Sequence, residues 1–387
     1  MKMPQNNWIL PDGVEDLLTD RALWLEQKRE VLNSTFQSFG FQPVITPLIE
    51  FTDTLIFGSS NDLDIQTFKV TDQISGKQMG IRTDITPQIT RIYDTYYKNS
   101  EICRFYYIDN VLRTRINESG ESRIPIQVGA ELLGDSSLQS DSEIIILLCR
   151  ILKDISKEQI YLDIGNIGIF NSILSKIDFS KDDQNKLIDL IKIKSQNALK
   201  DFLNTMDLEK DLHQALLALP KMHGNFVNIE KDKEVLIRFG EDVINKINYL
   251  QQVYKLVSAS CPDVEIKYDL SEAKGFDYEK DIIFSAYLGT SSRPVALGGR
   301  YDKIINDIKG IGFTLNIKEL IGEPNSFDGL YVMTEITEDQ NQIKAINELR
   351  QSGNIVIYVN SNNKNAYKDC CNRELVCVNN KWELKEI

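Results

Sequence analysis

Residues 102–134 read ICRFYYIDNVLRTRINESGESRIPIQVGAELLG, and the expected fold is built around them. Its two arms, 102–115 and 123–134, are rich in β-branched and aromatic residues and surround the polar, glycine-containing connection INESGESR. Arms of this composition joined by a polar turn segment are typical of a β-hairpin. We therefore expect two antiparallel strands here.

The polar residues inside this hairpin are the first candidate site residues. Arg113 and Arg115 lie on one arm, and Gln127 and Glu131 lie on the other. Gln127 and Glu131 are an even number of positions apart, so their side chains leave the same face of a strand. They either converge on one ligand or form a solvent-facing polar row, and the local sequence leaves both alternatives open.

The segments before the hairpin alternate between helix and strand signals. Apolar residues at helical spacing predict an amphipathic helix over 20–39, which Gly40 ends. GFQPVITPLIEF (40–51) is β-rich but contains prolines, as edge or interface strands do. FKVTDQISGKQMGIR (68–82) predicts a second hairpin, and a helix opens at Thr86-Pro87.

After the hairpin the sequence becomes more helical. Asp141 is the expected N-cap of an apolar helix, SEIIILLCRILKDI (142–155), and IYLDIG (160–165) follows as a strand. Residues 173–257 show helical spacing with one polar side, which predicts a helical insertion.

The remaining segments complete the expected domain organisation. Short strands return between 264 and 299, a helix is expected from Gly312 through Leu320, and a strand, a helix and a strand follow Phe327. At about 150 residues per domain, 387 residues predict two or three domains. The fold class is α+β, with an antiparallel sheet flanked by helices. The expected parts are a main domain (1–172 and 258–322), a helical insertion (173–257) and a small C-terminal α/β domain (328–387).

Composition and charge exclude several classes of protein. The chain has 44 Lys and Arg against 57 Asp and Glu, a net charge of −13, and such a field repels phosphate backbones. The N-terminus has no signal-peptide pattern, and no window reaches the roughly 18 apolar residues of a membrane span. We expect a soluble, cytoplasmic protein with no membrane partner.

Cysteine and histidine offer little material for catalysis. The six cysteines form no C-x-x-C pair and have no histidine at ligand spacing, so buried free thiols are expected and no metal. His213 and His223 both fall in the stretch read as helical, which disfavours Ser/His/Asp and Cys/His catalysis. A hydrolase triad is therefore not expected, and no cofactor is expected either.

Two further clusters place polar residues among apolar ones. IRTDITPQ (81–88) carries Arg82, Asp84 and Thr86, for which the alternative is a simple helix cap. The other cluster combines KGFDYEKDIIF with GGRYD, and its alternative is a pair of glycine-stabilised turns. Its candidate residues are Lys274, Asp277, Tyr278, Arg300 and Asp302.

Taken together and in order, these segments resemble the catalytic module of histidyl-tRNA synthetases over most of residues 8–322. GFQPVITPLIE is similar to the dimer-forming first motif of class II synthetases, IRTDIT to their LRPEGT element, and LRTR…SRIPIQVGAE to the arginine hairpin of the second motif. KGFDY and GGRYD are similar to the two histidine-specific elements. The resemblance implies the class II aminoacyl-tRNA synthetase fold.

The resemblance also implies a pocket for histidine. Asp84 and Thr86 match residues that hold the ammonium group, with Gln127 beside them, and Glu131 and Tyr278 match groups that receive the imidazole. Elementary chemistry agrees, because an amino acid requires a carboxylate for its ammonium and a cation for its carboxylate, here Arg113. Lys274 replaces the arginine of the histidine-specific element and completes the implied histidine-binding set.

Departures from the synthetase pattern fall on the parts that handle ATP. In the third motif, Asn316 replaces a glycine and Glu319 an ATP-binding arginine, and a carboxylate there repels triphosphate. In the arginine hairpin, Arg115 stands for an acidic residue, Glu121 for a basic one, and Pro125 for the aromatic that stacks on adenine. These changes predict that adenylation fails.

A chain with histidine contacts but without ATP contacts resembles the HisZ family, the regulatory subunits of ATP phosphoribosyltransferase. The resemblance implies a non-catalytic subunit that activates the short-form catalytic subunit in the first step of histidine biosynthesis and carries allosteric feedback inhibition by L-histidine. It implies self-association as a dimer, a hetero-octamer with the catalytic subunit, and no tRNA, since sixty residues after Phe327 are few for an anticodon-binding domain. The alternatives are an active histidyl-tRNA synthetase and a free-standing transferase of histidine to another amine.

Overall fold

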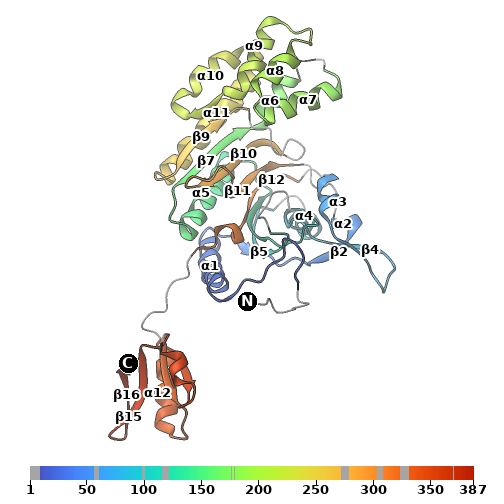
Figure 1. The fold of residues 1–387 in the computed structure, drawn as a ribbon. Coiled ribbons are helices and arrows are strands. Elements are labelled where there is room, and N and C mark those ends of the chain that lie inside the picture. Colours follow the sequence, from blue (N-terminus) through green and yellow to red (C-terminus); the bar gives the residue numbers. More distant parts are fainter. Residues whose placement is uncertain are drawn as a thin grey trace, which may run out of the picture. The chain divides into compact units, whose positions relative to one another are not determined.

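The computed structural model describes most of the chain (Figure 1). The chain divides into two compact units, Met1–Glu323 and Pro324–Ile387. The described residues are 9–55, 61–97, 101–115, 122–175, 177, 179–271, 279–302, 308–322, 331–368 and 370–387.

A large mixed sheet organises the first unit. Nine strands of the described ranges form it, in the spatial order β1 (Gln42–Pro43), β5 (Cys103–Asn110), β6 (Ile126–Leu133), β12 (Gly310–Asn316), β11 (Ala296–Tyr301), β10 (Glu279–Leu288), β7 (Ile160–Asn166), β9 (Glu265–Asp269) and β8 (His223–Asn225).

The central hairpin of the sheet forms as the sequence predicts. β5 and β6 pair in antiparallel fashion, with Asp109 opposite Gln127 and Phe105 opposite Glu131. The antiparallel order continues through β12, β11, β10 and β7. The expectation of an antiparallel sheet is wrong only near the edges, where β1 pairs with β5 and β7 with β9 in parallel, because these strands enter the sheet by longer crossovers.

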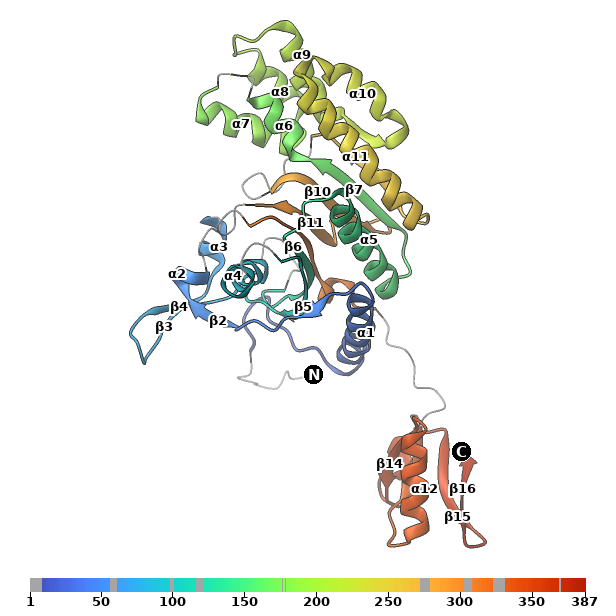
Figure 2. The ribbon, with the colours of Figure 1, turned by 180° about the vertical axis from the view of Figure 1, so that it is seen from behind.

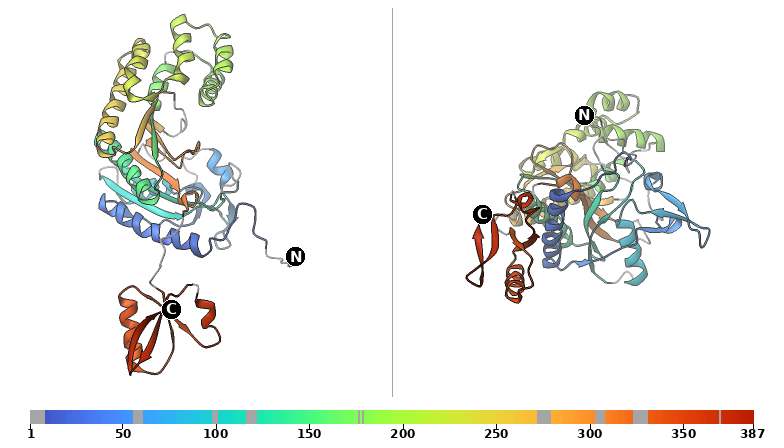
Figure 3. Two further views of the ribbon diagram at one scale, coloured as in Figure 1. Left: turned by 60° about the vertical axis from the view of Figure 1, so that its left-hand side comes forward. Right: turned by 60° about the horizontal axis from the view of Figure 1, so that its bottom comes forward.

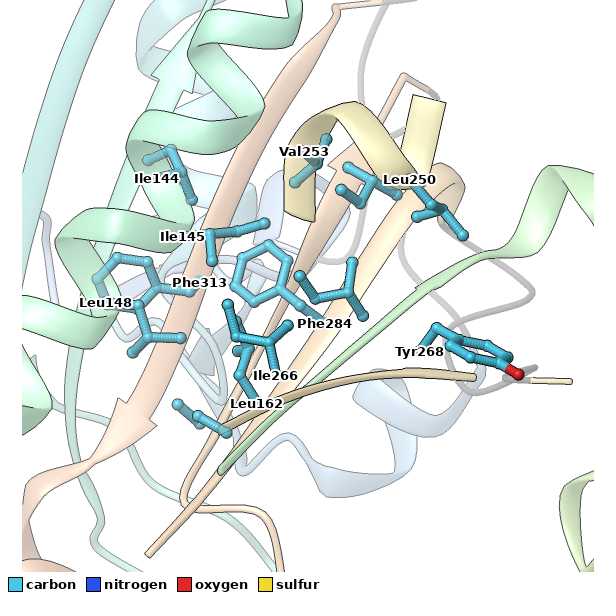
Figure 4. Close-up of a cluster of buried hydrophobic side chains, with 14 of the residues drawn as sticks. Ile144, Ile145, Leu148, Leu162, Leu250, Val253, Ile266, Tyr268, Phe284 and Phe313 are labelled. Carbon is cyan, nitrogen blue, oxygen red and sulfur yellow. The ribbon is translucent and has the colours of Figure 1, made fainter. Parts of the chain in front are cut away.

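Three long helices lie across one face of the sheet (Figures 2 and 3): α1 (Thr19–Ser38), α5 (Leu138–Ile155) and α11 (Glu241–Ser260). α5 contacts both other helices as well as β6, β7 and β12. Figure 4 shows the interior between them, where Ile145 and Leu148 of α5 and Leu250 of α11 meet Phe284 and Phe313 of the sheet. Burial of these apolar side chains is the main force that holds the helices on the sheet.

The start of α5 differs from the sequence-based expectation. Ser137, not Asp141, is the N-cap, because the Ser137 hydroxyl accepts a hydrogen bond from the Ser140 amide (3.2 Å). Asp141 lies inside the first turn, is buried, and pairs with Arg300 of β11. The Asp141 carboxylate thus pairs with the Arg300 guanidinium, which is distant in sequence, and does not cap the helix.

The opposite face of the sheet carries α4 (Thr86–Tyr96), which begins at Thr86-Pro87 as predicted. Ile89 and Tyr93 of this helix pack against Phe105 and Tyr107 of β5. A small sheet lies beside it, and the hairpin predicted over 68–82 forms two of its strands. Its elements are β2 (Ile49–Phe51), β4 (Gln78–Ile81) and β3 (Lys69–Thr71), next to the short helices α2 (Thr52–Leu55) and α3 (Asn61–Gln66).

The helix expected from Gly312 through Leu320 is wrong for most of its length. Residues through Asn316 form β12, and only η4 (Ile317–Leu320) is a short 3-10 helix. β12 is a central strand between β6 and β11, and Gly310 and Gly312 let neighbouring side chains approach its backbone. Glycine disfavours a helix interior but suits such close strand contacts.

The stretch predicted as a helical insertion is mainly helical. It also contains β8, which pairs with β9 at the sheet edge, so His223 lies on a strand while His213 lies on a helix. The elements before α11 are α6 (Ile167–Leu174), α7 (Lys181–Lys192), α8 (Gln196–Leu203), α9 (Lys210–Ala218), η1 (Leu219–Lys221), η2 (Phe226–Asn228), α10 (Ile229–Leu236) and η3 (Ile237–Phe239).

The second unit contains the strand, helix and strand expected from its sequence, followed by a hairpin. Val332, Ile346, Val356 and Leu375 form a buried cluster between its helix and its sheet. In sheet order its described strands are β14 (Ile355–Val359), β13 (Tyr331–Glu335), β15 (Arg373–Val378) and β16 (Lys381–Glu386), and its helices are α12 (Gln340–Gln351) and η5 (Lys364–Tyr367).

Candidate functional site

Glu131 is the centre of the candidate site. It lies in β6 with 1% of its surface exposed. The Thr86 hydroxyl donates to its Oε1 (2.9 Å) and the Tyr301 hydroxyl to its Oε2 (2.8 Å). Burial raises the pKa of Glu131 to about 8, and these hydrogen bonds only partly oppose that effect. Glu131 therefore carries a proton at neutral pH in the unliganded protein.

Two glycines on neighbouring strands make room around this carboxyl group. Gly312 lies opposite Glu131 in the sheet, and a Cβ atom at Gly312 would be 1.9 Å from Glu131 Oε2. A Cβ atom at Gly129 would be 2.4 Å from the Tyr107 ring. Only residues without a side chain fit these two positions.

Tyr107 and Tyr301 complete the walls around Glu131. The Tyr107 hydroxyl lies 3.3 Å from Thr86 Oγ1, and burial raises the pKa of both tyrosines far above its usual range. Neither tyrosine is among the site residues predicted from the sequence. A usable signal existed for Tyr301, which belongs to the GGRYD motif, whereas the role of Tyr107 depends on its register opposite Gly129.

Gln127 and Asp84 connect the start of α4 to the same strand. Gln127 accepts the Ile85 amide through Oε1 (3.1 Å) and donates to Asp84 Oδ1 through Nε2 (3.3 Å). Asp84 Oδ1 also accepts the Thr86 amide (3.1 Å). The structure thus brings Asp84, Thr86, Gln127 and Glu131 into one hydrogen-bonded group.

These contacts decide between the alternatives that the sequence left open. Gln127 and Glu131 are buried, so a solvent-facing polar row is wrong. The helix-cap alternative for Asp84 holds in part, since its carboxylate bonds the Thr86 amide although Ile85 is the N-cap. The Asp84 carboxylate therefore bonds both the start of α4 and, through Gln127, strand β6.

Arg113 follows β5, and its backbone amide donates to the Arg123 carbonyl (2.9 Å). Its Nε is buried and has no hydrogen-bond partner within the described ranges. A buried guanidinium N–H needs an acceptor, and a ligand carboxylate is one. Arg82 differs, because it bonds Asn110, Thr46 and Asp109 of the surrounding chain and is fully engaged in holding them.

Arg300 lies on the opposite face of the sheet from Glu131. Its guanidinium bonds Asp141 and Ser140 of α5 and the Asp135 carbonyl (2.9 Å). Because successive strand residues face opposite sides, the next residue, Tyr301, reaches Glu131. GGRYD therefore forms part of β11, and the alternative of a turn is wrong there.

Of the other candidate residues in KGFDYEKDIIF and GGRYD, one lines a cavity and the rest lie in the undescribed part of the chain. Asp302 lines a cavity of about 410 Å³ on the α5 side of the sheet, together with Asp141, Tyr249 and Asp281. The predicted site residues Lys274, Asp277 and Tyr278, and the departure at Glu121, lie outside the described residues.

The residues expected to disrupt ATP binding lie at the end of β12. Asn316 is opposite Gln127 and donates through Nδ2 to Glu319 Oε1 (2.6 Å). Its Oδ1 accepts the Ile126 amide (3.2 Å), which fixes this pair beside β6. Pro125 is buried, and Arg115 and Glu319 are exposed. Glu319 thus lies in η4, directly after β12, and β12 is the strand next to β6, which carries Gln127 and Glu131.

The described residues contain no group of three or more His, Cys, Asp or Glu side chains arranged to hold a metal ion. In the same part of the chain, every helix is too short or too polar to span a lipid bilayer.

Comparison with known proteins gives consistent matches over most of the chain. A family model described as histidyl-tRNA synthetase matches residues 13–320, and one described as the C-terminal domain of the ATP phosphoribosyltransferase subunit HisZ matches residues 332–385. The ATP phosphoribosyltransferase regulatory subunit of Teredinibacter turnerae is 35% identical, over 91% of each chain.

Solved structures agree in fold. A protein of Bacillus halodurans described as ATP phosphoribosyltransferase regulatory subunit/histidyl-tRNA synthetase superposes with a TM-score of 0.81 at 22% identity, covering 94% of this chain and 95% of that one. A chain of the ATP phosphoribosyltransferase (HisG:HisZ) complex of Thermotoga maritima gives a TM-score of 0.60 at 20% identity, covering 78% and 98%. The class II synthetase-like fold predicted from the sequence is confirmed.

Proposed function

The chain belongs to the family of ATP phosphoribosyltransferase regulatory subunits, and on that premise we propose that it activates a short-form catalytic subunit and transmits feedback inhibition by L-histidine. The observation that carries the histidine part is the buried Glu131, which Thr86 and Tyr301 hold beside Asp84 and Gln127. The Thermotoga maritima neighbour, described as a HisG:HisZ complex, supports a catalytic partner.

The proposed ligand uses each polar group of the site. The ammonium of histidine binds Asp84 and the Thr86 hydroxyl, with Gln127 orienting Asp84. Its carboxylate binds Arg113, whose buried Nε has no acceptor among the described residues. By the family resemblance, Lys274 belongs to the same histidine-binding set. Its imidazole binds Glu131 and, by the same resemblance, Tyr278. A ligand without the imidazole leaves Glu131 with only its bonds to Thr86 and Tyr301, and a ligand without the ammonium leaves the Asp84 charge without a cation, so such ligands should bind more weakly.

The ATP side of the site supports a regulatory rather than a catalytic role. By the family resemblance, Glu319 stands at the position where synthetases have an ATP-binding arginine, and Asn316 donates a hydrogen bond to it. A negative charge there opposes a triphosphate. The protein therefore acts on its partner as a regulator and does not adenylate histidine.

Pyrophosphate exchange tests this loss of chemistry against the alternative, an active histidyl-tRNA synthetase. We expect no histidine-dependent exchange of pyrophosphate into ATP above the level without histidine, because the triphosphate is not seated. A genuine histidyl-tRNA synthetase assayed under the same conditions is the control. Exchange at the rate of that control would overturn the regulatory assignment and favour the alternative.

Regulation without catalytic groups requires coupling between two sites. A subunit of this kind changes its partner's rate only by favouring one of the partner's states. Two elements bond Glu131 at the proposed site and continue away from it: α4, through Thr86, and β11, through Tyr301. We propose that these elements carry the signal, and linkage then requires histidine and the partner's substrates to affect each other's binding by the same factor.

Turnover by the catalytic subunit, titrated with this protein and then with histidine, tests the proposed function. We expect activation without histidine and inhibition with it. Asp84→Asn keeps an acceptor for the Thr86 amide but removes the charge that faces the ammonium. Since a hydrogen bond to a charged group contributes about 1.5–3 kcal/mol, the half-inhibiting histidine concentration should rise roughly 10- to 150-fold, with activation retained.

Asp72→Asn is the matched control for this variant. Asp72 lies in the exposed turn between β3 and β4, where it bonds the Ile74 and Ser75 amides. It should leave both activation and inhibition unchanged. Inhibition that is equally sensitive in Asp84→Asn and wild type would remove the ammonium from this site.

A further inference from the structure

Two cysteines meet at the junction of α5 and α11, away from the histidine site. Cys149 lies on α5 with 2% of its surface exposed, and half-buried Cys261 directly follows the end of α11. Both line one cavity of about 580 Å³, whose rim also carries Arg150, Lys153 and Asp263. A small solute in this cavity can therefore reach the thiol pair.

The two thiols differ in burial and in pKa. The neighbouring Cys149 thiol lowers the pKa of Cys261, an effect that the Lys153 charge supports and Asp263 opposes. The proximity of Cys261, together with burial, raises the pKa of Cys149. Lys153 and Asp263 also form an ion pair with each other. The pair thus contains one accessible thiol with thiolate character and one enclosed thiol beside it, which is the usual arrangement of a reactive and a resolving cysteine.

We propose that Cys149 and Cys261 are a modification site, a thiol pair that a hydroperoxide converts to a disulfide joining α5 to α11. The Cys261 thiolate attacks the outer peroxide oxygen, forming an S–O bond while the O–O bond breaks and the leaving alkoxide or hydroxide takes up a proton. The Cys149 sulfur then attacks the Cys261 sulfenic acid, forming the S–S bond and releasing water. Two thiols lose two electrons in total, and the hydroperoxide gains them.

The cross-link joins two helices that also bind one another near the far end of α5. There Tyr249 of α11 donates to Asp141 Oδ2 (2.5 Å), and Asp141 holds Arg300 of β11. A disulfide between residues 149 and 261 closes a long loop and restricts the unfolded chain. Oxidation should therefore raise the midpoint of thermal unfolding by several degrees.

Peptide mapping of the full-length protein tests the proposal. The reduced protein is treated anaerobically with an equimolar amount of hydrogen peroxide, alkylated and digested without reductant. We expect a disulfide-linked peptide pair containing Cys149 and Cys261, and an upward shift in thermal unfolding that dithiothreitol reverses. Cys103 is the matched control, since it is also buried and burial raises its pKa, but it contacts no other thiol within the described residues.

Two variants separate the steps of the reaction. In Cys149→Ser, the sulfenic acid on Cys261 should persist and be captured by dimedone, whereas in Cys261→Ser neither the cross-link nor a label at Cys149 should form. The mapping also distinguishes this cross-link from oxidation of Cys370 and Cys371, which are adjacent in the sequence of the second unit and whose sulfurs lie 3.9 Å apart. Oxidation of Cys261 no faster than that of Cys103, or sulfenic acid on Cys261 of the wild type without the cross-link, would overturn the proposal.

Discussion

Replacing Glu131 by Ala is expected to weaken L-histidine binding by about 1–3 kcal/mol, roughly a 5- to 150-fold rise in Kd. The imidazole N–H loses its acceptor, and Thr86 and Tyr301 lose the carboxyl group that they bond in the free protein. Calorimetric titration of the wild type and the variant measures the difference. Equal affinities would place the imidazole elsewhere, and a wild type that does not bind at millimolar histidine, alone or in its complex, would contradict the site itself.

The same carboxyl group should make histidine binding depend on pH. The pKa of free imidazole is about 6.5, and the pKa of Glu131 in the unliganded protein is raised to about 8. Between these two pKa values, free histidine has a neutral imidazole and unliganded Glu131 carries a proton. The two groups together then hold one proton, which is the number that a carboxylate–imidazolium pair requires. Below this window binding must release a proton, and above it binding must take one up. Affinity should therefore be highest between about pH 6.5 and 8 and fall up to tenfold per unit on either side.

Glu131→Gln is the control for this pH dependence. It cannot take up or release the proton, so its affinity should be lower and should lack the change in slope near pH 8. The unliganded protein gives a second readout. The folded-state pKa of Glu131 lies above its ordinary value of 4.5, so the folded state holds the extra proton, and the free energy of unfolding should fall as pH rises from about 4.5 to 8. A wild-type affinity that is constant from pH 6 to 9 would contradict a shared proton.

The second large effect is expected at the buried ion pair between Arg300 and Asp141. Arg300→Met should lower the free energy of unfolding by about 3–5 kcal/mol, because Asp141 then remains buried without its cation. Asp141 is 1% exposed, and burial already raises its pKa while Arg300 lowers it. Urea unfolding at neutral pH measures the loss.

Arg150→Met on α5, the helix that carries Asp141, is the matched control. Arg150 is 58% exposed and pairs with Asp154, and exposed pairs contribute about 0–1 kcal/mol. Replacing Arg300 and Asp141 together by apolar residues should restore part of the stability, since no buried charge is then left alone. A loss below about 1 kcal/mol in Arg300→Met would mean that the pair does not hold β11 on α5.

The local features of this protein could be predicted from neighbouring residues in the sequence. Strand composition around a polar turn predicts the β5–β6 hairpin, and Thr86-Pro87 marks the start of α4. The even spacing of Gln127 and Glu131 places both on one face of a strand. Local rules suffice for these features because turn chemistry, helix starts and strand alternation each depend on residues within a few positions.

Which face of β6 is buried, and which partner each polar side chain binds, depend on tertiary contacts. Strand alternation cannot tell a buried row from a solvent-facing one, whereas in the folded protein Thr86 of α4 and Tyr301, 170 positions away, both bond the buried Glu131. Asp141 has the local sequence of a helix cap, but in the folded protein it accepts a hydrogen bond from Arg300, 159 positions away. The mistaken helix at Gly312 has the same origin, since a central strand is stabilised by its neighbours in the sheet. Contacts between residues distant in sequence set these outcomes, and their energies do not appear in any local pattern.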